Sequence, residues 1–78
     1  MKQKDPVAEA ELARLAKKFR EAAGKTRAEA ARDMGIKHPS IFHAEESPEK
    51  GYLKLRIRMI EKYSPFKVIG PVFLLERK

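Results

Sequence analysis

The sequence predicts a mainly α-helical domain of four short helices, followed by a β-strand or hairpin at the C-terminal end. Apolar residues recur at helical spacing in four segments that end at glycine, proline or a polar loop. The stretch after the fourth segment is rich in β-branched and aromatic residues. With 78 residues, 42% hydrophobic and 37% charged, the chain has the length of one domain and is too apolar for a disordered one.

The first helix has boundary signals at both ends. Asp5 is placed to cap its N-terminus, and Pro6 follows at the first helical position, where a missing N–H is harmless. Gly24 occupies the usual position for a helix end. The apolar face consists of Ala8, Leu12, Leu15, Ala16 and Phe19. We therefore divide the chain into a flexible segment 1–5, a helical domain 6–63 and a C-terminal extension 64–78.

The second and third helices are short and are separated by a tight turn. Thr26 and Glu29 have the spacing of a capping box, which predicts a helix start at residue 27. Gly35 predicts the stop, in a left-handed conformation. Pro39 is tolerated only in a first turn, so the third helix begins close to it and runs to about residue 45.

The fourth helix is expected from Tyr52 to Tyr63, after a loop over residues 47–51. Ser64 and Pro65 end it. Its predicted apolar face consists of Leu53, Ile57 and Ile60. Its predicted outer, basic side consists of Lys54, Arg56, Arg58 and Lys62.

The stretch over residues 66–75 reads as an extended strand with a bend, bulge or hairpin turn at Gly70 and Pro71. A lone strand cannot satisfy its own backbone groups, so it folds back, pairs with another segment or pairs with a second chain. A further alternative is that it caps the core of its own chain. Apolar residues on both faces favour a homodimer, with a dimerisation element formed by Phe66, Val68, Val72, Phe73, Leu74 and Leu75.

The charge of the chain points to a polyanionic partner. Lys and Arg number 18 against 11 Asp and Glu, a formal charge of +7. Such an excess is most typical of nucleic-acid binding, and less often of binding to an anionic membrane or an acidic protein. The sequence lacks an apolar run long enough to span a membrane and an apolar leader, so we expect a cytoplasmic protein without membrane contact.

Several kinds of chemistry are not expected. The chain has no cysteine, which excludes disulfides and thiolate metal sites. His38 and His43 are five residues apart and lack ligands in a known metal pattern. Neither a nucleophile–base grouping nor a glycine-rich phosphate loop is present. We therefore expect no catalysis, no metal, no cofactor and no small-molecule substrate.

Residues 26–45 resemble the helix-turn-helix of Cro/CI-type (XRE family) DNA-binding proteins. The resemblance is carried by Ala31, by Gly35 and Ile36, and by Ile41 and Glu45 at the offsets of the family pattern. It extends over about residues 8–63 and implies a lambda-repressor-like bundle of four helices.

The chain departs from this pattern at three places. Alanine stands at positions 30 and 44, where the family usually has leucine, and Pro39 is unusual in the third helix. The customary fifth helix is replaced by the apolar strand, as in Cro-type repressors whose C-terminal strand pairs across a dimer.

The resemblance implies a sequence-specific regulator of transcription that binds double-stranded DNA, most simply a small homodimeric repressor acting by operator occlusion. The third helix would then read bases in the major groove through Lys37, His38, Ser40, Phe42 and His43. Arg27 matches a family position that contacts phosphate or a flanking base. Charge and proximity in sequence add Lys25, Lys50 and Lys54 as backbone contacts.

Other interpretations remain open at this point. Within the same class, the chain fits an antitoxin-like or controller-type autoregulator. In a different class, the same fold serves as a protein-interaction adaptor or an RNA-binding module. Any single Lys or Arg is more often a solvated charge than a ligand. Phe42 fits a core or partner contact equally, and we interpret Glu45 as a structural residue at a helix end.

Overall fold

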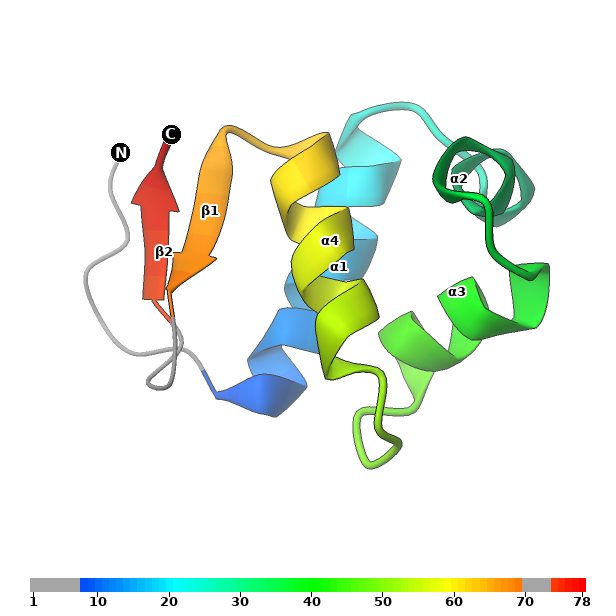
Figure 1. Ribbon diagram of the computed structural model, residues 1–78, viewed down its shortest axis with the longest axis horizontal. Coiled ribbons are helices and arrows are strands. Elements are labelled where there is room, and N and C mark those ends of the chain that lie inside the picture. Colours follow the sequence, from blue (N-terminus) through cyan, green and yellow to red (C-terminus); the bar gives the residue numbers. More distant parts are fainter. Residues whose placement is uncertain (1–7, 70–73) are drawn as a thin grey trace.

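The structure is a computed structural model that describes residues 8–69 and 74–78 (Figure 1). α1 and α4 pack side by side in the centre, with α2 and α3 at one end and an antiparallel hairpin at the other (Figure 1). This confirms the mainly helical class. No helix among these residues is both long and apolar enough to cross a membrane. The elements are α1 (Glu9–Ala22), α2 (Arg27–Met34), α3 (His38–Glu46), α4 (Leu53–Tyr63), β1 (Phe66–Ile69) and β2 (Leu74–Arg77).

The boundaries of α2 agree with the prediction. The Thr26 hydroxyl accepts a hydrogen bond from the Glu29 N–H at 3.1 Å, and the Glu29 carboxylate accepts one from the Thr26 N–H at 2.9 Å. These two reciprocal bonds satisfy backbone donors that the first turn leaves unpaired. Gly35 ends the helix with φ of 67°, a left-handed conformation that favours glycine. The turn from α2 to α3 is therefore encoded locally.

α1 begins later than predicted. Its first residue is Glu9 and its N-cap is Ala8, which offers no side-chain hydrogen bond. The predicted cap at Asp5 and Pro6 lies outside the described residues. Instead, Glu9 and Glu11 place two negative charges in the first turn, where they interact favourably with the helix dipole.

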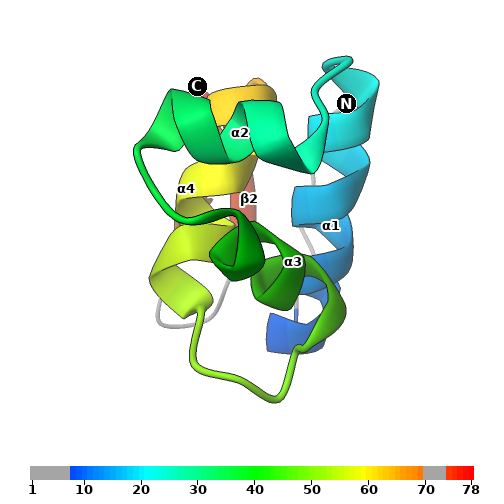
Figure 2. The same ribbon diagram turned by 90° about the vertical axis from the view of Figure 1, so that its right-hand side faces the viewer.

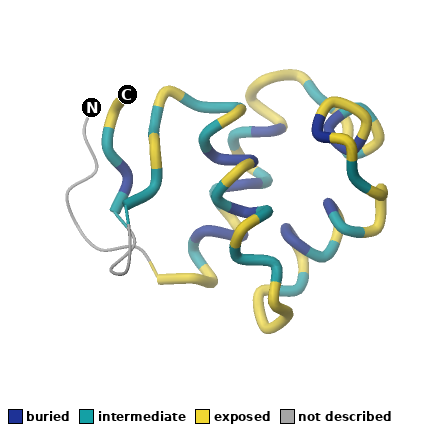
Figure 3. Tube along the Cα trace, viewed as in Figure 1, coloured by how far each residue is buried: buried dark blue, intermediate teal, exposed yellow. Residues whose placement is uncertain are grey.

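The hydrophobic core is small and rich in alanine. Its buried positions are spread over the four helices and β2 (Figure 3). Alanine side chains let neighbouring helix backbones approach closely, so the helices pack with little side-chain volume between them. On α4 the buried face consists of Arg56, Met59 and Ile60, whereas Ile57, predicted to be in the core, is only half-buried. The core residues are Leu12, Ala16, Ala30, Ala31, Met34, Ile41, Ala44, Met59, Ile60 and Leu75.

Arg56 was predicted on the outer side of α4, and this was wrong: the residue is fully buried. Its Nε donates to the Ala44 carbonyl at 2.8 Å, and its Nη2 donates to the carbonyls of Ser47 at 2.8 Å and Lys50 at 3.1 Å. Nη1 lies 3.3 Å from a carboxylate oxygen of Glu9. A planar group with several donors thus satisfies the Ala44 carbonyl, which the end of α3 leaves unpaired, and adds a second donor to two loop carbonyls that also accept backbone N–H groups. A prediction from helical spacing alone places such a charged side chain on the solvent-exposed face, because spacing carries no information about the carbonyls it contacts.

The C-terminal stretch folds back on itself as a hairpin, one of the alternatives that the sequence left open, and does not form the single strand that was favoured. β1 and β2 pair antiparallel within the chain, with Phe66 opposite Arg77 and Ile69 opposite Leu74. The predicted bend at residues 70 and 71 lies outside the described residues, as do Val72 and Phe73. The hairpin also covers its own core, because Leu75 is buried there and the Phe66 ring lies 5.9 Å from that of Phe19.

Truncating Arg56 tests its role in joining α3 to α4. We expect Arg56→Ala to lower the free energy of unfolding by about 3–5 kcal/mol, because it leaves the buried Ala44 carbonyl without a donor and leaves a cavity in place of a fully buried side chain. Lys54→Ala, an exposed position on the same helix, is the control and should change it by no more than about 0.5 kcal/mol. Urea unfolding followed by circular dichroism measures both. Equal, small effects would show that the loop does not depend on Arg56.

Candidate nucleic-acid interface

The residues predicted to contact DNA lie together at one end of the molecule. This end, here called the α2–α3 end, consists of α2, α3, the loops over residues 23–26 and 47–52, and the first turn of α4. Figure 2 faces it: α2 lies across the top, α3 is in the middle, and the loop after α3 is at the bottom. Lys25 lies in the loop before α2, whereas Lys50 lies in the loop after α3. The predicted backbone contacts therefore flank α3 on two sides.

The first turn of α3 is open to solvent. Lys37 is its N-cap and adopts an extended conformation, and Lys37, His38 and Pro39 are all exposed. Ser40 is half-buried and lines a groove of about 620 Å³ between this turn and the start of α4. Pro39 is within the first turn, as predicted. The exposed surface of this turn is polar, cationic and free of carboxylates.

Phe42 is the large apolar residue that the described part of the chain leaves exposed, at 44%. The Arg27 guanidinium lies over its ring, 5.0 Å from the centroid. The His43 ring meets it edge-on at 5.6 Å. The contact with Arg27 fixes the start of α2 against the solvent side of α3. Phe42 is therefore a surface residue, and not part of the core.

His43 is more constrained than its neighbours on α3. It is half-buried, its ring stacks on Tyr52 with 5.8 Å between centroids, and its Nδ1 lies 3.3 Å from the Ser47 hydroxyl. These contacts join the last turn of α3 to the loop that follows. His43 therefore has a clear structural role at the end of α3.

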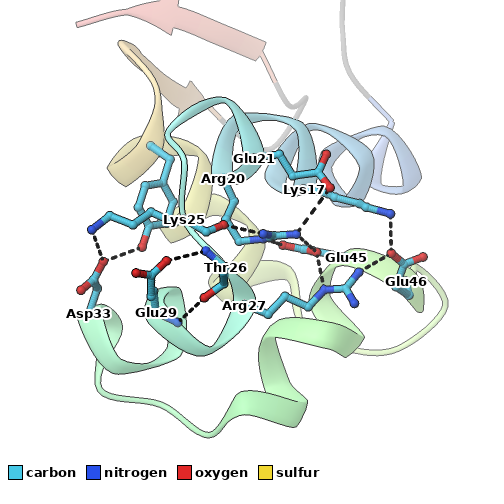
Figure 4. Close-up of polar contacts among 11 residues, drawn as sticks. Lys17, Arg20, Glu21, Lys25, Thr26, Arg27, Glu29, Asp33, Glu45 and Glu46 are labelled. Atoms are coloured by element: carbon cyan, nitrogen blue, oxygen red, sulfur yellow. Dashed lines mark hydrogen bonds and ion pairs between the residues drawn. The ribbon is translucent and has the colours of Figure 1, made fainter.

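Glu45 is a buried carboxylate shared by two arginines (Figure 4). Arg20 of α1 forms a fork with it, with Nε at 2.5 Å and Nη2 at 3.0 Å. Arg27 of α2 donates to it from Nε at 2.9 Å. The hydrogen bond from Arg20 to Glu45 raises the pKa of Arg20, so the guanidinium stays charged. Three helices thus meet at one carboxylate, which agrees with the structural role inferred from the sequence.

Glu46 is the next residue, and its environment differs from that of Glu45. One of its carboxylate oxygens accepts from Lys17 Nζ at 2.8 Å and from Arg27 Nη2 at 2.6 Å (Figure 4). The hydrogen bond to Glu46 raises the pKa of Lys17, and the same bond lowers the pKa of Glu46. Sequence reasoning did not find Lys17, because 29 residues separate it from Glu46 and no spacing rule connects them.

The predicted backbone contacts fall into two groups. Arg27 and Lys25 are engaged within the chain, since Lys25 Nζ lies 3.4 Å from the Asp33 carboxylate. Lys50 and Lys54 are exposed, and no carboxylate of residues 8–69 or 74–78 forms an ion pair with either. Arg32 on α2 is exposed in the same way and was not singled out, since nothing in its spacing distinguishes it from a solvated charge.

Tyr63 connects the far side of α2 to α4. Its hydroxyl donates to the Asp33 carboxylate at 3.2 Å. Burial, together with this hydrogen bond, raises the pKa of Tyr63 to about 12, so the hydroxyl remains a neutral donor at physiological pH. Asp33 is thereby shared between Tyr63 and Lys25, and the α2–α3 end keeps this carboxylate paired.

Removing the Glu45 charge tests whether it holds the three helices together. We expect Glu45→Gln to lower the free energy of unfolding by about 3–5 kcal/mol, because Arg20 is left buried without its counter-charge. Glu46→Gln removes the same charge one residue later, from an exposed side chain, and should leave stability close to that of the parent. Urea unfolding of both variants gives the comparison, and similar losses would contradict the assignment.

Comparisons with known proteins add no further constraint. No protein-family model, no curated protein and no solved structure matches this chain. Among the residues described, no three or more His, Asp or Glu side chains form a group that could hold a metal ion. The α2–α3 end is therefore interpreted from its own residues and contacts.

Proposed function

We propose that the chain is a sequence-specific regulator of transcription that binds double-stranded DNA, with α2 and α3 as a lambda-repressor-like helix-turn-helix. The observation that carries the proposal is the α2–α3 end itself. There the exposed first turn of α3 and the exposed Phe42 are flanked by Lys50 and Lys54, two cations that pair with no carboxylate in the described part of the chain. Occupancy of an operator would repress transcription by occlusion.

The pattern of burial supports the helix-turn-helix arrangement. Ala31 and Ile41 match the apolar positions of the family pattern, and they are 5% and 0% exposed. Gly35 has the left-handed conformation that a short turn between two helices requires. The two helices have 8 and 9 residues, so each is about two turns long.

Duplex DNA fits this surface better than duplex RNA. The major groove of B-DNA is about 12 Å wide and admits an α-helix, whereas that of A-form RNA is deep and narrow. In the proposed complex Lys37 donates to guanine O6 or N7, and Phe42 contacts thymine methyl groups. His38 and Ser40 contribute less selective contacts beside them. Lys50, Lys54 and Arg32 contact phosphates.

The hairpin supports a homodimer through one particular edge. The outward N–H groups of β1 already have acceptors: Phe66 donates to the Ser64 hydroxyl at 3.2 Å and Val68 to the Glu61 carboxylate at 3.0 Å. The Lys78 N–H donates to the Pro65 carbonyl at 2.8 Å, so these two residues form a hydrogen-bonded pair of the ladder. Since such pairs alternate along antiparallel strands, the backbone groups of Glu76 also face β1.

The same alternation directs the backbone groups of Leu75 and Arg77 away from β1. No described residue is bonded to them. We infer that β2 pairs antiparallel with β2 of a second copy, so that a four-stranded sheet forms across a twofold axis. Because the hairpin and the α2–α3 end lie at opposite ends of the chain (Figure 1), the two copies of α3 would lie at the two ends of such a dimer and address widely separated half-sites.

Binding of DNA is tested with duplexes selected from a random pool. We expect an enriched sequence and a steep fall of affinity with salt, because several phosphates are neutralised. Lys37→Ala should relax the base preference, whereas Lys54→Ala should weaken all sequences alike and reduce the slope of log affinity against log salt by about 1. A flat salt dependence, or no enriched sequence, would contradict the proposal and favour a protein-interaction adaptor.

The dimer is tested by removing a single backbone donor. Arg77→Pro deletes an N–H that faces away from β1, so the hairpin should survive, since proline is tolerated on an outer edge. Arg77→Ala keeps the N–H and is the matched control. Sedimentation velocity should find a dimer for Arg77→Ala and a monomer for Arg77→Pro. If Arg77→Pro remains a tight dimer, pairing through this edge is wrong.

A further inference from the structure

Glu46 brings together two cations that come from different helices. The same carboxylate oxygen accepts from Lys17 of α1 at 2.8 Å and from Arg27 of α2 at 2.6 Å. All three side chains remain accessible, with exposed fractions of 40% for Lys17, 27% for Arg27 and 34% for Glu46. An oxyanion held between two accessible cations, one of them a planar guanidinium, is also the arrangement in which a phosphate oxygen is bound.

The contacts of Arg27 explain why this arrangement would persist without Glu46. Arg27 uses Nε to bind the buried Glu45, and its guanidinium lies against Phe42. Only Nη2 is directed at Glu46. Loss of the Glu46 contact therefore leaves Arg27 in place, with Nη2 free for another anion. Glu45 positions the guanidinium, whereas Glu46 only occupies it.

The energetics favour exchange of Glu46 for a stronger ligand. Ion pairs between accessible side chains contribute little to stability, because water competes for both charges. A backbone phosphate has several charged acceptor oxygens, so it can accept from Arg27 Nη2 and from Lys17 together. Its neutralisation by these cations also releases counterions condensed on the DNA. Glu46 is thus a weak, displaceable ligand for both cations.

We propose that Lys17 and Arg27 form a phosphate-binding site for the DNA backbone, and that the Glu46 carboxylate fills this site in the free protein and competes with DNA. This inference rests on the proposed function. It extends the interface from the α2–α3 end to α1, and it assigns Glu46 as the residue that limits affinity. The site lies beside the Phe42 ring, at the margin of the surface that faces the duplex.

The experiment compares DNA affinity for Glu46→Gln and Glu49→Gln at low salt in the full chain. Both remove one negative charge from the α2–α3 end, but Glu49 is exposed in the loop after α3 and forms no ion pair with a described residue. Glu46→Gln should bind the selected duplex roughly 3–10-fold more tightly than Glu49→Gln does, because Lys17 and Arg27 are then free to contact phosphates. Lys17→Ala in the Glu46→Gln background should remove most of that gain.

A second measurement examines the site without DNA. Inorganic phosphate is titrated while the side-chain resonances of Lys17 and Arg27 are followed by nuclear magnetic resonance. In Glu46→Gln these resonances should shift at several-fold lower phosphate concentration than in the parent chain. If Glu46→Gln does not fold, Glu46→Asp, whose shorter side chain cannot reach both cations, replaces it and should show an intermediate gain.

The outcomes separate the two proposals. If the parent chain binds DNA and Glu46→Gln binds no more tightly than Glu49→Gln, the competition is refuted and the proposed function stands. If phosphate shifts Lys17 and Arg27 in Glu46→Gln while no variant binds any duplex, the anion site is real and the proposed function fails. No phosphate response in either chain would refute the site itself.

Discussion

The buried carboxylate of Glu45 is the interaction on which the arrangement of the first three helices depends. A charge removed from water must be paired and hydrogen-bonded, and here the partners are Arg20 of α1 and Arg27 of α2. Apolar contacts between alanines do not fix one helix at a single position along its neighbour, because the side chains are too small to interdigitate. The bidentate contact between Arg20 and Glu45 does fix it, because both hydrogen bonds are lost if either helix shifts. The polar cluster therefore supplies the register that so small a core does not.

Arg56 performs the corresponding task between α3 and α4. Its three carbonyl partners come from the last turns of α3 and the loop that follows, so one guanidinium fixes the exit of the chain from α3. Together, Glu45 and Arg56 hold α3 from both sides, while its first turn and Phe42 remain exposed. An exposed helix that is held rigidly is suited to recognise a defined surface, because the conformational entropy lost when side chains are immobilised on binding lowers affinity.

Local signals in the sequence placed the ends of α2 and the start of α3 correctly but started α1 too early, and no signal in the sequence pointed to the long-range contacts. Thr26, Gly35 and Pro39 predicted the ends of α2 and the start of α3, since capping depends on residues only a few positions apart. Helical periodicity misplaced the buried face of α4, because it treats Arg56 as a solvated charge. The sequence left open whether residues 66–75 form one strand or a hairpin, because neither half of this stretch reads as a separate strand. The contact between Lys17 and Glu46 depends on tertiary structure alone, and so do the contacts that engage Arg27 within the chain.

The capped outer edge of β1 has a consequence for assembly size. An exposed strand edge is a template on which further chains can add without limit, as in fibrils. In a sheet built from two hairpins joined through β2, both outermost strands are β1, and each has its outward donors from Phe66 and Val68 already bonded to Ser64 and Glu61. With these donors already bonded, each outer β1 edge of the proposed dimer would be a poorer template for a third copy, so Ser64 and Glu61 would limit growth of the assembly.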